Sequence, residues 1–454
     1  MIRRSLAVAL ATALLPLSAH AADLLQVYEM ARNGDPQLSA AESTRLYDKE
    51  GAVQARAALL PQINGTASLN RTRTEADADA DANSGTVTSK RRNYTIDGSQ
   101  TLFNWTQINN LRSQRELSKA ADFTLDSAND SLIVRSSAAY FNVLVAIESL
   151  NAAQTNEAAA KKQFDFADKR LEVGLAPITD VHEARAQYDQ ARANTIVAQN
   201  TLADNYQALT ELTGQPVMNL KGLPADFRPE VPANRGNISE LVQQATSQNP
   251  ALKAQELKVS AAEAGVQAAR GGHYPTLSLG GSWGKSATWG DSVGSGSLSP
   301  DARTNSIGLT LSVPIFSGGA TQSGVRQALA QRDIAQDGYE QQKRALDRNT
   351  RNAYQTLVQG ISEVEARRLA VVSAQSAYDA SQVGLEVGTR TVLDVIQNQR
   401  ILFSAQLDYA NARYTFLQNR LLLSQSLGAL DVAELQDINR LLTQDAGNPA
   451  TTTN

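Results

Sequence analysis

The chain has 454 residues, of which 42% are hydrophobic but only 5% aromatic, and its formal net charge is −4. It contains no cysteine, which excludes disulfides, thiolate metal sites, cysteine catalysis and a lipid-modified N-terminal cysteine. The acidic balance argues against nucleic acid as a partner, and no stretch of about 20 apolar residues beyond the N-terminus predicts a transmembrane helix. The low aromatic content suits long helices packed along alanine-rich seams better than a spherical core.

Residues 1–21 have the features of a secretory signal peptide. Arg3 and Arg4 form a positive region, Leu6–Leu17 an apolar region, and Ala19-His20-Ala21 a small-residue cleavage site. Removing this segment changes the net charge from −4 to −6, because it holds two arginines and no acid. We therefore expect an exported, acidic mature chain; the alternative is a buried N-terminal helix.

Most of the mature chain is a tandem repeat. Structure-breaking and polar residues recur 214 positions apart: Pro36 and Pro250, Pro61 and Pro275, Gly174 and Gly388, Asp180 and Asp394. Solenoid repeats run to roughly 20–50 residues, so a period this long indicates a duplicated supersecondary unit. We assign residues 22–214 to the first repeat, 238–428 to the second, and 215–237 to a proline-rich connector.

Each repeat is predicted to open with a helix, roughly Leu24–Leu59 and Ile238–Arg270. Asp35-Pro36 and Asn249-Pro250 divide each of them into a short and a longer helix. Pro61 and Pro275 then stop the helices, because proline blocks helical continuation.

A β-hairpin is predicted next in each repeat, over 62–103 and 276–316. In the second copy, apolar residues alternate with small polar ones along both strands, at Leu277, Leu279, Gly281 and Trp283 and again at Ile307, Leu309, Leu311 and Val313. The first copy shows the same pattern more faintly. Alternation over about 9–10 residues has the length of a tilted membrane-spanning strand, although a soluble hairpin packed on the helices has the same pattern.

The polar loop of the first hairpin carries Asp77, Asp79 and Asp81 at alternate positions. This run lacks the glycine and the bidentate glutamate of a calcium-binding loop, so we expect a solvated loop and predict no metal site.

Four strands cannot form a barrel alone. An open sheet in lipid would leave backbone groups without hydrogen bonds at its edges, and the smallest membrane barrels have about 8 strands. Three chains would supply about 12 strands.

A long helix is predicted to follow each hairpin, over 104–171 and 319–387, and the first of these ranges holds neither proline nor glycine. Gly174 and Gly388 are positioned to end these helices as left-handed caps. Return helices are predicted over 178–212 and 391–427. They carry heptad-spaced stripes that begin at Val181 and Val395, which we interpret as core. The tail 429–454 has no counterpart in the first repeat and ends in polar residues, so we expect partial disorder.

The two turns carry a family resemblance. Val-Gly-Leu-Ala-Pro-Ile-Thr-Asp-Val (173–181) and Glu-Val-Gly-Thr-Arg-Thr-Val-Leu-Asp-Val (386–395) resemble the TolC family of outer-membrane channels, as does Ala-Arg-Ala-Gln-Tyr-Asp (184–189). The resemblance covers the mature chain to about Gly428. It implies a mixed α and β membrane protein: a homotrimer with a twelve-stranded β-barrel, four strands from each chain, in outer-membrane lipid. A long periplasmic α-helical barrel would continue it, with the connector and tail forming an equatorial belt.

The same resemblance implies the function. The expected protein is a passive exit duct of the Gram-negative cell outer membrane, without a cofactor, for solutes or proteins driven by an inner-membrane pump. That pump would be of the RND, ABC or MFS type and would act through a periplasmic adaptor (membrane fusion) protein. Two other classes stay open on the residues alone. One is a soluble periplasmic coiled-coil scaffold or adaptor. The other is an enzyme, for which the only histidines after the signal segment are His182 and His273.

Site residues follow from the resemblance. The adaptor would dock on the turns, which comprise Val173, Gly174, Leu175, Val387, Gly388 and Thr389. Arg390 would link to Thr179 and Asp180 of a neighbouring helix pair and hold the entrance shut, and Asp394 would face the lumen in an acidic ring. Two residues depart from the family pattern: Leu385 replaces a tyrosine, and Gln397 replaces a second ring aspartate. These departures predict a looser latch and a less cation-selective entrance.

Simpler roles remain possible for the same residues. Thr391 and Asp394 have the spacing of a capping box at a helix start, and one aspartate can cap a helix and face a lumen at once. Arg390 alone could be a solvated charge, and Gly174 and Gly388 could serve only as helix caps.

Overall fold

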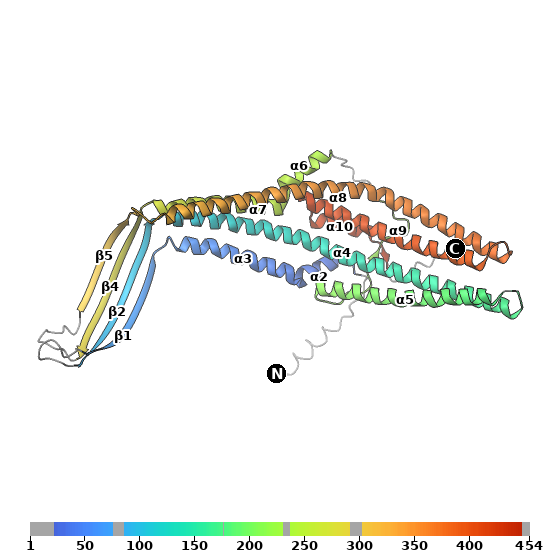
Figure 1. Ribbon diagram of the computed structural model, residues 1–454, viewed down its shortest axis with the longest axis horizontal. Helices are drawn as coiled ribbons and strands as arrows, with labels where there is room; N and C mark the ends of the chain where they lie inside the picture. The colour runs from blue at the N-terminus through green and yellow to red at the C-terminus, as the bar shows by residue number, and fades with distance from the viewer. Residues whose placement is uncertain (1–21, 76–85, 176, 230–236, 291–301, 447–454) are drawn as a thin grey trace, which may run out of the picture. The chain divides into compact units, whose positions relative to one another are not determined.

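The computed structural model describes residues 22–75, 86–175, 177–229, 237–290 and 302–446 (Figure 1). The predicted signal segment 1–21 and the run Asp77, Asp79 and Asp81 lie outside these residues. The described chain forms two compact units. One draws on residues within 1–41, 125–250 and 343–454, and the other comprises residues within 42–124 and 251–342.

One unit contains the sheet. Its strands are β1 (Gln62–Glu75), β2 (Thr86–Phe103), β4 (Thr276–Gly290) and β5 (Ala302–Ser312). They are antiparallel in the order β1-β2-β4-β5, so the two hairpins join through β2 and β4 (Figure 1). β5 ends four residues before the predicted end of the second hairpin at 316, and Val313 lies outside the strand. Pro314 explains the early end, because it has no N–H for the ladder.

The helices next to the sheet are α3 (Pro36–Ala57), α7 (Pro250–Arg270) and the first parts of α4 (Trp105–Glu172) and α8 (Ala320–Glu386). After α7, the short helix η1 (Gly271–His273) leads into β4. A Cβ at Gly271 would lie 2.4 Å from the Thr106 Oγ1 atom, and that hydroxyl donates to the Ala268 carbonyl at 3.0 Å. This close crossing holds the start of α4 against the end of α7.

α4 and α8 are the longest elements, with 68 and 67 residues. At 1.5 Å per residue each is about 100 Å long. By length and composition, α4 contains a window apolar enough to cross a membrane, but 56% of that window is buried inside the chain. The expectation that no segment has this composition was therefore too strong. The burial is that of a core helix.

The other unit is helical. It contains α2 (Leu24–Gly34), α5 (Ile178–Thr213), α6 (Ile238–Gln248), α9 (Val392–Leu427), α10 (Val432–Leu441) and the remaining parts of α4 and α8. Its core is built from side chains that are almost completely buried: Leu24, Leu132, Tyr140, Leu144, Leu220, Leu417, Leu421, Leu435 and Ile438. These residues come from both repeats, from the connector and from the tail, so this unit joins the two halves of the chain.

The two repeats fold alike at the ends of their short helices. A Cβ at Gly34 would lie 2.3 Å from the Thr213 carbonyl oxygen, so α2 and α5 end in contact. In the second repeat, a Cβ at Gly428 would lie 2.7 Å from the Gln248 carbonyl carbon, where α6 and α9 end. Gly34 and Gln248 are 214 positions apart, as are Gly214 and Gly428.

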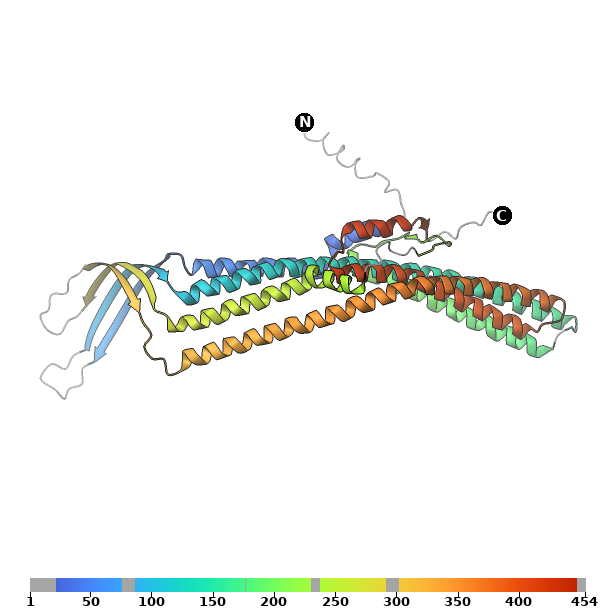
Figure 2. The same ribbon diagram turned by 90° about the horizontal axis from the view of Figure 1, so that it is seen from above.

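The tail contains a helix that the sequence analysis did not predict. Val432–Leu441 forms α10 (Figure 2), and its Leu435 and Ile438 side chains are fully buried. Partial disorder of the segment 429–454 stays a prediction. The Asp431 side chain caps this helix by accepting from the Glu434 N–H at 2.9 Å. Beyond it, β6 (Gln444–Asp445) pairs with β3 (Lys221–Gly222) of the connector. The cap and the apolar spacing within α10 were present in the sequence, but the tail has no repeat counterpart to draw attention to them.

Candidate functional site

The predicted turn residues lie at the two ends where a long helix meets its return helix. α4 ends in a Schellman motif. Gly174 has a φ of +71°, and its N–H donates to the Leu171 carbonyl at 2.9 Å. The Leu175 N–H donates to the Arg170 carbonyl at 2.8 Å. Glycine suits this position because other residues rarely adopt a positive φ.

α8 ends in the same motif. Gly388 has a φ of +79°, and its N–H donates to the Leu385 carbonyl at 3.2 Å. The Thr389 N–H donates to the Gly384 carbonyl at 2.8 Å, and the Thr389 hydroxyl donates to the same oxygen at 3.1 Å. Both helix ends therefore reverse the chain with one backbone geometry, as the repeat predicts.

Exposed apolar side chains surround both turns. Val173 and Val387, at equivalent positions, are 69% and 68% exposed. Leu175, Ile178 and Leu393 are also exposed. Grouped apolar side chains at the surface mark sites of interaction, so each turn presents a small apolar surface on a rigid helical support.

Thr391 and Asp394 form the capping box that their spacing predicts. The Asp394 carboxylate accepts from the Thr391 N–H and from its hydroxyl, both at 2.9 Å, and the Asp394 N–H donates to the Thr391 hydroxyl at 3.2 Å. The backbone and side-chain hydrogen bonds from Thr391 hold the pKa of Asp394 below its usual range, with a smaller contribution from the Arg390 charge. Asp394 therefore stays ionised at neutral pH.

Arg390 and Asp180 line one pocket of about 410 Å³, formed by residues of α4, α5 and the turn before α9. Arg390 is exposed, Thr179 is exposed and Asp180 is half-buried. Within the described part of this single chain, the Arg390 side chain forms no hydrogen bond or ion pair with Thr179 or Asp180; its backbone N–H donates to the Gly384 carbonyl. The structure thus brings Arg390 and Asp180 to one pocket without joining them, and Thr179 does not line that pocket.

The two residues that depart from the family pattern have different surroundings. Leu385 is 7% exposed and packs with Val392, Val395 and Ile396 between α8 and α9. Gln397 is exposed on α9. Leu385 therefore stabilises the hairpin by apolar packing, a role that a hydrogen-bonding tyrosine would share only in part.

One polar link was not predicted. The buried Gln399 side chain on α9 donates to the Asn156 side chain of α4 at 2.7 Å and to the Asn156 carbonyl at 3.0 Å. It ties the second repeat to the first. The heptad stripe that begins at Val395 places Asn398, and not Gln399, on the core face. Val395 and Leu402 of that stripe are buried as predicted, and Gln399 is a buried residue that the stripe missed.

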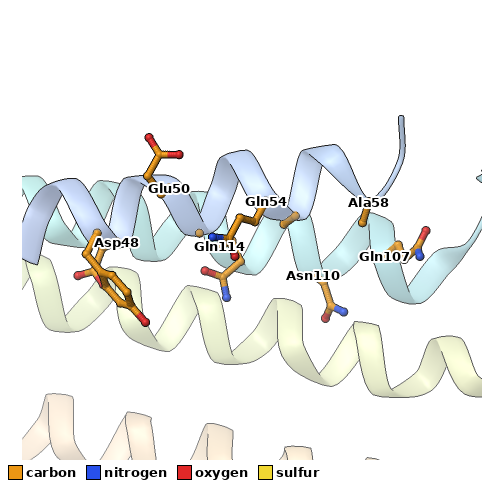
Figure 3. Close-up of a pocket in the computed structure, with 10 residues that line it drawn as sticks. Asp48, Glu50, Gln54, Ala58, Gln107, Asn110 and Gln114 are labelled. Carbon is orange, nitrogen blue, oxygen red and sulfur yellow. The ribbon is translucent and has the colours of Figure 1, made fainter. Parts of the chain in front are cut away.

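A second pocket, of about 600 Å³, lies in the unit that contains the sheet (Figure 3). Gln54 of α3, Ala58 just after that helix, and Gln107, Asn110 and Gln114 of α4 line it, and no sequence signal predicted it. Across the described residues, no group of three or more histidine or acidic side chains is placed to hold a metal ion.

Comparisons with known proteins match this arrangement. The family model described as outer membrane efflux protein matches residues 27–215 and again 241–429. The two matches start 214 residues apart and end 214 residues apart, the offset seen in the sequence.

Several relatives are similar over most of their length. Outer membrane protein TolC of Vibrio cholerae serotype O1 is 32% identical over 422 residues, covering 92% of this chain and 93% of the relative. The TolC protein of Escherichia coli K12 is also 32% identical, covering 93% and 86%. The alkaline protease secretion protein AprF of Pseudomonas aeruginosa is 28% identical, covering 93% and 88%.

Solved structures share the fold. The CmeC outer membrane channel of Campylobacter jejuni has a TM-score of 0.77 at 19% identity, covering 92% of this chain and 90% of that one. The open state of the MtrE outer membrane channel of Neisseria gonorrhoeae has a TM-score of 0.70 at 21% identity, with 89% of each chain covered.

Proposed function

Because this chain belongs to the outer membrane efflux protein family, we propose that three copies form a passive duct from the periplasm through the outer membrane. Solutes or proteins leave through it, driven by an inner-membrane pump of the RND, ABC or MFS type that is coupled through a periplasmic adaptor. The chain itself contributes a path and a gate, with no chemical step.

The observation that supports this proposal is the open sheet. β1 and β5 are its edges, and each leaves one side of its backbone ladder without a strand partner among the described residues. One face carries exposed apolar side chains, including Ile63, Ile307, Leu309 and Leu311. In lipid an open edge is strongly unfavourable. The edge of one copy therefore pairs with the opposite edge of another until the sheet closes.

Three copies of the sheet are the smallest number that would form a β-barrel with an open lumen. Two four-stranded sheets would give about eight strands, a barrel whose interior is just wide enough for its own side chains. Three would give about twelve. The face of the sheet opposite the apolar one carries small hydroxyl and amide side chains, as a water-filled lumen requires.

The long helices provide the remaining length. α4 and α8 are each about 100 Å long, far more than a membrane needs. α3 also exposes Leu46, Tyr47 and Val53 on its surface. Side chains of this kind would be covered if helices of neighbouring copies lie alongside, as in a helical barrel.

The turns are the proposed adaptor surface. Val173, Leu175 and Val387 are the exposed apolar contacts, and the Schellman motifs at Gly174 and Gly388 fix their positions. Apolar groups on a pre-organised support bind with little loss of conformational entropy.

Arg390, Thr179 and Asp180 form the proposed latch. Arg390 and Asp180 already line one pocket, so a small movement or a neighbouring copy can bring them together. An exposed ion pair contributes about 0.2–1 kcal/mol, so three copies favour the closed state by at most about 3 kcal/mol. Adaptor binding can supply that difference. Asp394, ionised and capping α9, forms the proposed acidic ring at the entrance.

A soluble scaffold or adaptor is the second candidate. It explains the helical hairpins equally well, but it leaves the apolar face of the sheet in water. An enzyme is the third candidate, and no observation in the described chain favours it.

Edge pairing can be tested with cysteines, because the chain has none of its own. Cysteine pairs, one on β1 between 62 and 70 and one on β5 between 304 and 312, are scanned for disulfide formation in outer membranes. If β1 of one copy pairs with β5 of the next, one pair yields a covalent trimer that conducts ions in planar bilayers. Co-expressed single-cysteine variants are the control and can yield only dimers. Recovery of a soluble, non-conducting monomer would contradict the proposal.

A further inference from the structure

Basic side chains are concentrated on one face of the sheet. They belong to the ends of the strands that lie farthest from α3, α4, α7 and α8, as the ribbon shows (Figure 1). Residues directly opposite one another in an antiparallel sheet point to the same face, and the face alternates along each strand. The register therefore assigns every strand residue to a face. Six basic residues share the face of Ile96 and Ile307 and are here termed the basic belt: Arg71, Arg73, Lys90, Arg92, Lys285 and Arg303.

The apolar part of the same face lies nearer the helices. Row by row, Leu279 is opposite Leu309, Gly281 opposite Ile307, and Ile96 opposite Trp283. The next row holds Tyr94, Lys285 and Arg303, and the belt begins there. The change from aliphatic to aromatic to basic side chains along the strands is the order expected from the hydrocarbon core to the headgroup layer of a membrane.

The opposite face does not share this charge. Its members are mostly serine, threonine, asparagine and glycine, and it carries one basic residue, Arg91. Among the side chains of this four-stranded sheet that the structure describes (62–73, 88–103, 276–289 and 302–312), Asp97 is the single acid, and it lies on this polar face. Solubility alone does not explain this difference, because basic residues on the polar face would increase solubility equally well.

Two cation pairs lie directly opposite one another within the belt. Arg71 is opposite Lys90 across β1 and β2, and Lys285 is opposite Arg303 across β4 and β5. Like charges at directly opposite positions destabilise a sheet. A bound anion that bridges each pair would convert this repulsion into attraction, and a phosphate group can accept several charge-assisted hydrogen bonds at once.

We propose that the basic belt is a binding surface for the phosphate-bearing headgroups of outer-leaflet lipid, with Lys285 and Arg303 holding one phosphate group and Arg71 and Lys90 another. The acyl chains of the same lipid lie along the apolar rows at Ile307 and Leu309. Trp289, opposite Lys90, and Tyr94, whose ring lies 5.7 Å from the Arg92 guanidinium carbon, provide the interfacial aromatic contacts. This inference rests on the proposed placement of the sheet in the membrane.

Native mass spectrometry of the detergent-solubilised, full-length protein tests the proposal. The probes are diphosphorylated lipid A and the same glycolipid with its phosphates removed. The test variant combines Lys285→Gln with Arg303→Gln. The matched control is Arg91→Gln, which removes one charge from the same region of the sheet but from the polar face. Planar-bilayer conductance and oligomeric mass are recorded for each variant.

The unmodified protein and the Arg91→Gln variant are expected to retain the diphosphorylated lipid. The double variant should bind it roughly 30-fold more weakly, the factor that corresponds to losing two such charges near an anionic surface. Equal binding of the phosphate-free lipid, or equal loss in the Arg91→Gln variant, would overturn the proposal, as would full displacement of the lipid by inorganic phosphate alone. If conductance and trimer mass persist while lipid binding fails these criteria, the belt proposal is wrong and the duct proposal stands.

Discussion

Asp394 and Thr391 bond to each other reciprocally: each backbone N–H donates to the other's side chain, at 2.9 and 3.2 Å. The same carboxylate that caps α9 is also ionised, because these bonds hold its pKa below the usual range. A cap and a lumenal charge are therefore compatible in one residue, and two substitutions can separate them.

Asp394→Asn should weaken cation preference in reversal-potential measurements, because it removes the proposed ring charge. Thr391→Ala is the matched control, since it removes the cap hydroxyl and keeps the carboxylate. The pKa of Asp394 is lowered because its ionised carboxylate accepts the capping hydrogen bonds from Thr391. The contribution of this cap to folding stability is therefore present at neutral pH and is lost as the pH falls through the pKa of Asp394 in the folded state. If Asp394→Asn leaves selectivity unchanged, Asp394 is a cap alone.

Arg390→Ala should raise single-channel conductance in planar bilayers. Losing up to about 3 kcal/mol of latch energy raises the open population by a factor of up to about 100. Arg185→Ala is the control, because Arg185 is an exposed arginine of α5 that pairs with Asp189 at 3.9 Å and lies outside the proposed latch. Equal conductance of the two variants would remove Arg390 from the latch.

Val173→Ser and Val387→Ser should each weaken adaptor binding about tenfold, since each removes about 1.5 kcal/mol of apolar burial. Binding of a purified adaptor to the detergent-solubilised protein measures the effect. Leu369→Ser is the comparison, because Leu369 is an exposed apolar residue of α8 that lies 18 positions before Val387. If it weakens binding as much as the turn variants do, the contact is not at the turns.

A partly buried ion pair fastens the connector to the helices. Arg413 of α9 contacts Glu148 of α4 and donates to the Pro224 carbonyl at 3.2 Å, and the Tyr414 hydroxyl donates to Glu148 at 2.9 Å. Arg413→Met should lower the free energy of unfolding by about 3 kcal/mol, because it leaves a partly buried carboxylate without its cation. Adding Glu148→Gln should restore part of this loss.

Denaturant unfolding measures both Arg413 variants. Arg367→Gln is the control, because its pair with Asp408 is exposed and contributes about 1 kcal/mol at most. A loss from Arg413→Met no larger than that of the control would show that the partly buried pair of Arg413 and Glu148 does not stabilise the fold.

The helices were predictable because single residues mark their ends. Gly174 and Gly388 need a positive φ, and Pro36 and Pro250 restart a helix one residue after a break, so the sequence locates these boundaries within a residue or two. The sheet was predictable in the second repeat, where alternation is strong. The pairing of β2 with β4 depends on residues far apart in the chain, and no local pattern specifies it.

The buried polar contacts could not be predicted for the same reason. Asp35 caps α3 by accepting from the Gln37 and Leu38 N–H groups, and it also bonds to Arg135 at 2.5 Å. Burial alone would raise the pKa of Asp35, but the Arg135 bond and the cap together hold it below its usual range. The Asp35-Pro36 break in the sequence indicated the cap. The ion pair could not be predicted, because Arg135 lies 100 residues away in the chain.

Asp130 of α4 is half-buried one turn after Asp126, and burial followed by the Asp126 charge raises the pKa of Asp130 to about 6. An acid whose pKa is raised by folding destabilises the fold when ionised. Asp130→Asn should therefore raise the Tm at pH 7–8, and the gain should vanish below about pH 4, where the carboxyl is protonated in both states. Asp126→Asn, which removes only the repulsion, should give a smaller gain.

The second repeat carries Glu340 and Arg344 at the positions equivalent to Asp126 and Asp130, where opposite charges at this spacing attract. Asp130→Arg should accordingly raise the Tm at least as much as Asp130→Asn does. If the Tm gain of Asp130→Asn does not depend on pH, the ionised Asp130 carboxylate is not what destabilises the fold.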